Sequence, residues 1–130
     1  MNHFILYVQD QTRSTMFYKE VLRIEPELNV PGMTEFRLSA QTILGLMPAA
    51  GIERLLGPGI GNATPAPNSA RGELYFVVED AEAYHRRAVE AGAREISSRS
   101  LRDWGHHVAY SMDSDGYVLA FASPSRAQAE

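Results

Sequence analysis

The chain has 130 residues, a net charge of -4 and no cysteine, and 45% of its residues are hydrophobic. This length fits one domain, or two very small halves that share one core. The lack of cysteine excludes disulfides and thiolate metal sites. Lysine and arginine are scattered, and no apolar stretch approaches the roughly 20 residues that a membrane span needs. We therefore expect a soluble cytoplasmic protein with neither nucleic acid nor a membrane as its partner.

The first half of the chain has the pattern of one strand, one helix and three further strands. Residues 3–8 are apolar or aromatic throughout and predict a buried strand. Asp10 can cap a helix that begins at Gln11 and ends before Pro26, because its carboxylate accepts from free N–H groups of the first turn. The helical spacing predicts a buried stripe of Met16, Phe17, Val21 and Ile24. Short strands are expected at residues 28–30, 34–38 and 42–47.

The second half repeats this order after a linker. Residues 49–71 are rich in glycine and proline and predict a linker, in which Leu55 and Leu56 can form a short helical turn. A strand at 73–78 and a helix at 81–91 follow, with His85 expected on a solvated face beside Arg86 and Arg87. Further strands are expected near Ile96 and at 108–112 and 117–122, the last two joined by a hairpin turn at residues 113–116.

The repeated order predicts an α+β fold of two βαβββ repeats with one helix per repeat. The repeats span about residues 1–48 and 72–123, joined by the linker at about 49–71, and together make residues 1–130 a single domain. Each helix can cover only one face of its small sheet, so the other face must be buried or line a cavity. Two such sheets would form an open cup-shaped mixed sheet, and cups with convergent side chains are ordinary ligand sites.

Several short motifs occur in an order that is typical of one superfamily. They are YVQD at residues 7–10, RS at 13–14, FY at 17–18, VL at 21–22, WG at 104–105 and DSDGY at 113–117. Together they resemble the vicinal-oxygen-chelate superfamily, which holds glyoxalases, bleomycin-resistance proteins and extradiol dioxygenases. Ser114 stands where the late turn of the family usually has proline. The resemblance runs from about residue 3 to residue 123 and implies the same cup-shaped fold.

The resemblance also implies a divalent metal held from four inward positions, one per strand. Carried over to this chain, these positions fall on His3, Gly45, Glu73 and Ala120. Gly45 and Ala120 cannot bind a metal, and two protein ligands are fewer than the three that are typical of a catalytic site. We therefore expect no metal cofactor. If Zn, Ni, Mn or Fe binds after all, His3 and Glu73 would hold it, with His106 or Glu35 as a further ligand.

Strand alternation sorts the side chains that would line the cup. If His3 faces the cup, Phe4, Leu6 and Val8 pack on the helix. The resemblance implies that Tyr110, three residues before the late turn, also faces the cup, and alternation then places His106 on the same side. The proposed lining is His3, Ile5, Tyr7, Ile43, Met47, Glu73, Tyr75, His106 and Tyr110, with Trp104 able to stack on an aromatic ligand. Each also has a purely structural interpretation, because His3 and Glu73 can be solvated and the aromatic residues can be core. The lining favours a partly apolar ligand, with a cationic group opposite Glu73.

Three functions remain open at this point. The first is binding of a small, partly apolar molecule without a metal, as the resemblance to the bleomycin-resistance branch implies. The second is an enzyme, either a metal-dependent lyase or dioxygenase that uses His3 and Glu73, or a metal-free isomerase or lyase with Glu73 as general base. The third is an auxiliary domain with no chemistry. Family members of this size usually pair, so the resemblance also implies a homodimer.

Overall fold

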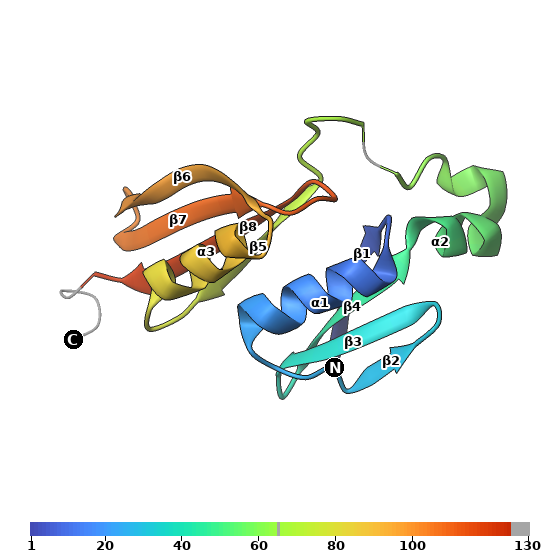
Figure 1. The fold of residues 1–130 in the computed structure, drawn as a ribbon, viewed down its shortest axis with the longest axis horizontal. Coiled ribbons are helices and arrows are strands. Elements are labelled where there is room, and N and C mark those ends of the chain that lie inside the picture. Colours follow the sequence, from blue (N-terminus) through green and yellow to red (C-terminus); the bar gives the residue numbers. More distant parts are fainter. Residues whose placement is uncertain (65, 126–130) are drawn as a thin grey trace. The chain divides into compact units, whose positions relative to one another are not determined.

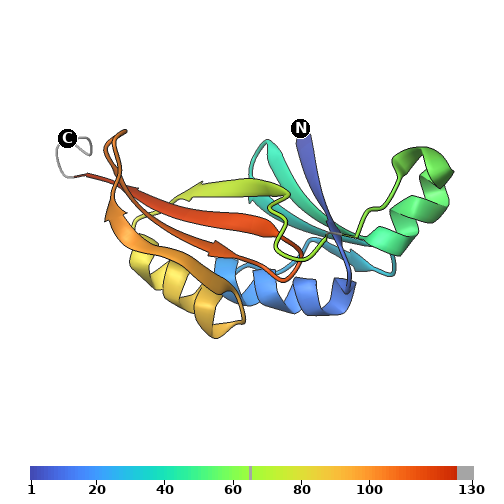
Figure 2. The same ribbon diagram turned by 90° about the horizontal axis from the view of Figure 1, so that it is seen from above.

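The computed structural model describes residues 1–64 and 66–125 of the chain (Figure 1). The chain divides into two compact units, Met1–Ala66 and Pro67–Glu130. Each unit holds a four-stranded mixed sheet with a helix along one of its faces (Figure 2). The predicted α+β class with two βαβββ repeats is therefore confirmed. Among the described residues, no helix is long and apolar enough to cross a membrane.

The first unit begins with β1 (Asn2–Val8), and the helix α1 (Gln11–Leu22) follows it. The remaining strands are β2 (Leu28–Val30), β3 (Met33–Ser39) and β4 (Thr42–Pro48). The order across the sheet is β1-β4-β3-β2, with β1 parallel to β4 and the other pairs antiparallel. These strands lie where the sequence pattern predicts them.

The second unit has the same topology. Its elements are β5 (Gly72–Val77), α3 (Ala81–Glu90), β6 (Arg94–Leu101), β7 (His106–Met112) and β8 (Tyr117–Pro124). The order across the sheet is β5-β8-β7-β6, and β5 is parallel to β8. Asp80 caps α3 as Asp10 caps α1, since their carboxylates accept from the backbone N–H groups of Ala83 and Arg13.

The helix decides which face of each sheet becomes core. In the first unit Leu44, Leu46 and Phe36 are fully buried, and the strand register places them in rows with Phe4, Leu6 and Thr34. The equivalent layer of the second unit joins Phe76 to Phe121 in a stacked pair, with Tyr84 of α3 also against Phe121. The opposite set of alternating side chains is left on the open face of each sheet.

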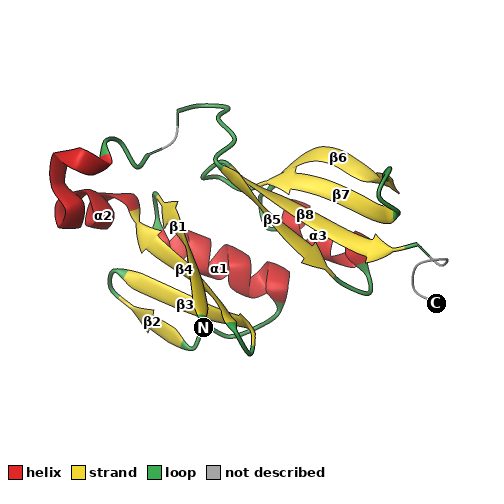
Figure 3. Ribbon diagram, turned by 180° about the vertical axis from the view of Figure 1, so that it is seen from behind, coloured by secondary structure: helices red, strands yellow, loops and turns green. Residues whose placement is uncertain are grey.

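The linker contains more structure than its composition predicts. Residues 49–56 form the helix α2 (Ala49–Leu56), and the 3-10 turn η1 (Gly57–Ile60) follows it (Figure 3). Ala49 and Ile52 of α2 are buried together with Ala63, and Tyr7 and Met47 pack against them. The prediction of only a short helical turn at Leu55 and Leu56 is wrong. The apolar side of α2 packs against Tyr7 at the end of β1 and Met47 at the end of β4, and local composition does not reveal this contact.

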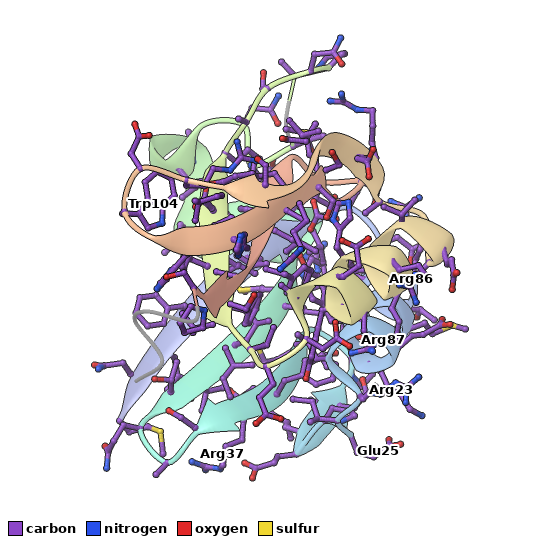
Figure 4. The ribbon with its side chains drawn as sticks, turned by 90° about the vertical axis from the view of Figure 1, so that its left-hand side faces the viewer. Arg23, Glu25, Arg37, Arg86, Arg87 and Trp104 are labelled. Atoms are coloured by element: carbon purple, nitrogen blue, oxygen red, sulfur yellow. The ribbon has the colours of Figure 1, made fainter. Side chains whose placement is uncertain are left out.

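His85 corrects a second expectation. Its side chain is only 3% exposed, and its Nε2 lies 2.8 Å from Oε2 of Glu95 on β6. The helical period places His85 in one row with Ala81 and Ala88, which are also buried, whereas Arg86 and Arg87 extend from α3 beside it (Figure 4). The position of His85 in this row of the helix predicts its burial better than the polar character of its side chain does.

Two apolar side chains are more exposed than their pattern predicts. Met16 was placed in the buried stripe of α1, but it is exposed, and Tyr18 is buried in its place. Phe4 was expected to pack on α1 with Leu6 and Val8, yet it is 58% exposed. Phe4 lies on β1, which is an edge strand, towards the beginning of that strand. Alternation assigned Phe4 to the same side of the sheet as Leu44 but did not predict that it is exposed.

The turn between β7 and β8 is held by the carboxylate of Asp113. Its Oδ1 accepts from the backbone N–H groups of Asp115 and Tyr117, each at 2.9 Å, and the side chain is buried. Gly116 closes the turn with a φ of 89°, and an added Cβ there would lie 2.5 Å from the backbone oxygen of Ser69. The turn therefore depends on both the buried acceptor and the missing side chain.

Replacing Asp113 should destabilise the protein, because two buried backbone donors would lose a charged acceptor. We expect Asp113→Ala to lower the free energy of unfolding in urea by about 2 kcal/mol. Asp113→Asn, which keeps one acceptor oxygen, should cost less, and Ser114→Ala at an exposed position of the same turn should cost least. Equal stability of the alanine variant and the parent chain would show that the turn does not depend on this carboxylate.

Candidate ligand-binding face

The open face of the second sheet brings together most of the predicted site residues. The strand register places Glu73 beside Val118 and Met112, then Tyr75 beside Ala120 and Tyr110, then Val77 beside Ala122 and Val108. Paired residues point to the same side of a sheet, so these three rows lie on the side away from α3. The name aromatic face is used below for Tyr75, Trp104, His106 and Tyr110 on this side, together with their charged neighbours Glu73 and Arg102.

A chain of hydrogen bonds joins three of these side chains. The indole Nε1 of Trp104 donates to the hydroxyl of Tyr75 over 2.8 Å. The same hydroxyl lies 2.7 Å from Nδ1 of His106, and the two rings are 5.9 Å apart at their centroids. The three residues come from the β6–β7 loop, from β5 and from the start of β7, and Figure 4 shows Trp104 at that loop. Tyr75 is therefore the link between two segments that are about 30 residues away from it in sequence.

The floor of the aromatic face is made of small side chains. Val108, Ala120 and Ala122 are fully buried and form one cluster, against which Tyr110 packs. Ala120 and Ala122 lie on β8, between the strand of Tyr75 and the strand of His106. Small residues on this central strand leave room for the larger side chains of both neighbouring strands to lean across it. Tyr75 can thus reach His106 although their strands are not directly paired.

Arg102 is a member of this face that the sequence analysis missed. Its guanidinium lies over the ring of Tyr110, 5.0 Å from the ring centroid. One of its terminal nitrogens donates to Oγ of Ser97 over 2.8 Å and to the backbone oxygen of Val108 over 3.2 Å, while its Nε is buried without a partner. In the sequence, only its position two residues before Trp104 pointed to this face. Arg102 lies in the loop between β6 and β7, where strand alternation does not predict the direction of a side chain.

Tyr110 lies between opposite charges. Burial raises the pKa of its hydroxyl above the usual range, and the negative charges of Glu73 and of ionised Tyr75 raise this pKa further. The positive charge of Arg102 acts on the same pKa in the opposite direction. Both Glu73 and Arg102 are therefore near enough to Tyr110 to act on it electrostatically, from different sides of the aromatic face.

The open face of the first sheet carries the other predicted residues. Nδ1 of His3 lies 3.5 Å from Oε2 of Glu35, and Glu35 is paired with Gly45 across the sheet. A Cβ added to Gly45 would lie 3.2 Å from Cγ1 of Ile5 and 3.4 Å from the sulfur of Met33. Ile5 and Met33 therefore leave little room for a larger, metal-binding side chain at residue 45.

The remaining lining residues of this unit differ in exposure. Ile5 is exposed, Ile43 is buried, and Tyr7 and Met47 pack against the small core around α2. Tyr7 was predicted to contact a ligand, and in the structure it packs against this core cluster. The structure brings Tyr75, Trp104, His106 and Tyr110 together in the second unit, whereas His3 and Tyr7 belong to the first unit.

Comparison with known proteins identifies the family. The sequence profile described as the Glyoxalase/Bleomycin resistance protein/Dioxygenase superfamily matches residues 1–121. The chain therefore belongs to this superfamily, as its motifs indicated. A comparison with curated proteins finds no match.

Solved structures with the same fold are numerous but distant in sequence. A glyoxalase-related enzyme from Fulvimarina pelagi superposes with a TM-score of 0.79 at 17% identity, covering 95% of this chain and 86% of that chain. A glyoxalase/bleomycin resistance protein/dioxygenase family enzyme from Burkholderia phytofirmans gives a TM-score of 0.78 at 16% identity, covering 94% and 96%. The protein ATC0852 from Agrobacterium tumefaciens gives 0.74 at 24% identity, covering 95% of each chain. At these identities the similarity shows the fold alone.

The residues of this chain do not fit the four-ligand metal centre that the family resemblance implies. Gly45 and Ala120 occupy two of the four positions, and Ala120 is the buried floor of the aromatic face. Within the described ranges, no group of three or more His, Cys, Asp or Glu side chains is placed to hold a metal ion. The carboxylate beside His3 is that of Glu35, which comes from β3 and not from the expected strand β4.

The charges around Tyr110 generate a pH prediction. A raised folded-state pKa stabilises the fold below the unfolded-state value of about 10, and this contribution is lost as the pH rises through the folded-state pKa. Titration of tyrosine absorbance should show one late component that disappears in Tyr110→Phe. Glu73→Gln should lower the pKa of Tyr110, because it removes a nearby negative charge. Glu82→Gln on the exposed side of α3 should leave the pKa unchanged, and an equal effect of both variants would contradict the assignment.

Proposed function

We propose that this protein binds a small, partly apolar molecule on its aromatic face and does so without a metal. The observation that carries the proposal is the hydrogen-bonded chain of Trp104, Tyr75 and His106 above the buried floor of Val108, Ala120 and Ala122. Tyr75 is 39% exposed and Trp104 is 53% exposed, so large aromatic surfaces remain available to a ligand. Their polar atoms are tied together, which fixes the rings before any ligand arrives.

Fixed aromatic side chains are well suited to binding. A ring that is already held in one rotamer loses little conformational entropy when a ligand packs on it. Ligand sites commonly combine apolar and aromatic walls with a few polar groups that set orientation. On this face the polar groups are the carboxylate of Glu73, the hydroxyl of Tyr110 and the imidazole of His106. The absence of a metal-binding group at Gly45 and at Ala120 supports a metal-free site.

A second candidate function is a metal-dependent lyase or dioxygenase. The observation that favours it is the contact between His3 and Glu35, whose imidazole and carboxylate are both common metal ligands. Glu73 as a metal-free general base is a further variant of the enzyme hypothesis. The binding proposal stands ahead of both, because two ligands are fewer than a catalytic metal usually has and the aromatic face needs no metal to be formed.

The experiment uses the single tryptophan of the chain as the reporter of binding. Protein purified without a His tag is treated with chelator, checked by elemental analysis and titrated with 4-biphenylmethanol while Trp104 fluorescence is followed. We expect a saturable change that persists without metal. Removing the Tyr75 ring should weaken binding about tenfold in Tyr75→Ala, which corresponds to about 1.4 kcal/mol, whereas Leu55→Ala at an exposed position of α2 should bind as the parent does.

Two results would count against the metal-free site. One is the absence of any saturable change in Trp104 fluorescence. The other is about one tightly held metal per chain whose removal abolishes binding, as a metal site would require. The second result would move the metal-dependent candidate ahead, and loss of the metal in both His3→Ala and Glu35→Ala would then locate it.

We further propose that the chain forms a homodimer in a soluble, cytoplasmic setting. Support comes from the edge strands, since Phe4 on β1 and Val77 on β5 are each 58% exposed. Exposed apolar edge strands favour pairing with another chain. Sedimentation equilibrium should give twice the chain mass of 14.4 kDa, and Phe4→Lys with Val77→Lys should shift the protein towards monomer. A monomeric parent chain at micromolar concentration would contradict this proposal.

A further inference from the structure

A further cavity lies in the first unit, between the first turns of α1 and the turn that joins β2 to β3. Its volume is about 440 Å³, within the range of roughly 300–1,000 Å³ that is usual for sites of small molecules. The name hairpin cavity is used for it below. It is lined from α1 by Gln11, Thr15 and Met16 and from the hairpin by Asn29, Val30 and Pro31. None of the described residues that line it is charged, and none belongs to the aromatic face.

The side chain of Gln11 holds the two walls of this cavity together. Its Oε1 accepts from the backbone N–H of Gly32 over 2.9 Å. Its Nε2 donates to the carbonyl of Val30 over 2.8 Å and to Oγ1 of Thr34 over 2.9 Å. The helix is thus tied to the hairpin by three hydrogen bonds of one side chain. A cavity whose walls are already fixed loses little conformational entropy when a ligand enters it.

The hydroxyl of Thr34 organises the polar base of the cavity. This hydroxyl has one hydrogen, and it donates that hydrogen to Oδ1 of Asn29 over 3.1 Å. The hydroxyl of Thr15, 2.9 Å from that of Thr34, must therefore donate its own hydrogen. Thr34 accepts from Thr15 and from Gln11, so both of its lone pairs are also used. Thr34 is therefore saturated by groups of the protein.

This count leaves one donor group and one acceptor for a ligand. Nδ2 of Asn29 keeps both of its hydrogens, and no residue in the described part of the chain accepts from it. Oγ1 of Thr15 has donated its hydrogen and keeps its lone pairs. Both side chains line the cavity and are hydrogen-bonded to the same hydroxyl of Thr34, so the two free groups lie close together.

The apolar side of the cavity is supplied by Met16 and by the hairpin residues Val30 and Pro31. Met16 is 66% exposed, although it is one of the large apolar side chains of α1. Its flexible thioether can adapt to a surface that packs on it, and sulfur makes favourable contacts with aromatic rings. An uncharged ligand with a ring and a small polar group would therefore use both sides of the cavity.

We propose that the hairpin cavity is a second ligand site of this protein and that it takes an uncharged aromatic amide. The carbonyl oxygen of the ligand accepts from Nδ2 of Asn29, its N–H donates to Oγ1 of Thr15, and its ring packs on Met16. An amide fits because it offers one acceptor and one donor on adjacent atoms, as the two free groups of the cavity require. This inference is independent of the proposed function, since the two sites share no residue.

The first test is a titration of uniformly nitrogen-labelled protein with benzamide, followed by proton–nitrogen correlation NMR. We expect saturable shifts of the backbone N–H of Gly32 and of the side-chain amide of Asn29, which is identified by its loss in Asn29→Asp. The indole N–H of Trp104 reports binding on the aromatic face separately. Shifts confined to Trp104 would overturn this inference and leave the proposed function standing, and no shift at Asn29 or Gly32 at any benzamide concentration would overturn it as well.

Variants of the lining locate the site. Asn29→Asp keeps an acceptor oxygen for Thr34 but removes the free donor, so benzamide should bind about fivefold more weakly. Asn62→Asp makes the same change outside the cavity, where Oδ1 accepts from the N–H of Thr64, and should bind as the parent does. Met16→Ala should also weaken binding about fivefold, whereas Leu55→Ala on α2 should not. Equal binding by all four variants would overturn the inference.

The second test compares benzamide with N,N-dimethylbenzamide and with benzoate. The dimethyl compound has no N–H to offer to Thr15 and should bind about fivefold more weakly than benzamide. Benzoate should bind more weakly still, because the described lining has no cation to pair with its charge. Thr15→Val should remove the difference between the two amides, and Thr15→Ser, which keeps the hydroxyl, should retain it. Equal binding of the three probes to the parent protein would overturn the assignment of an amide ligand.

Discussion

A small sheet has two faces, and the single helix of each repeat can cover only one of them. This constraint organises the whole protein. Asp10 and Asp80 start the helices directly after β1 and β5, so each helix returns along the face that carries the bulky apolar residues. The opposite face is left to other side chains. In the second unit these are small on β8 and large on β5 and β7, so an open face becomes a floor with aromatic walls.

The same constraint separates the two units chemically. In the first unit α2 and Ala63 cover Tyr7 and Met47, which makes part of the open face into a second small core. In the second unit a loop of a few residues brings Arg102 and Trp104 back over the sheet, and both form polar contacts there. In the first repeat, α2 therefore adds to the core. In the second repeat, the β6–β7 loop adds polar and aromatic side chains to the open face. The two units therefore have the same topology but chemically different open faces.

Membership of the superfamily explains the fold of this chain better than it explains the aromatic face. The superfamily relationship accounts for the order of the elements and for the turns that begin and end them. It does not account for the hydrogen bonds that join Tyr75 to Trp104 and to His106. Ala120 illustrates the difference, because its small side chain removes a metal ligand and at the same time leaves room for Tyr75 to reach across β8.

The sequence by itself determined the elements, since period-2 alternation, the two capping aspartates and the DSDG turn are local signals. Together with the family resemblance, strand alternation also singled out Tyr75, His106 and Tyr110, and the WG motif singled out Trp104. The sequence could not predict α2, the burial of His85 or the contacts of Arg102. Each of these depends on a partner distant in the chain, and the hydrogen bonds of Tyr75 span about 30 residues. Only the tertiary structure decides such contacts, because pairing of strands, and not local composition, brings their atoms within bonding distance.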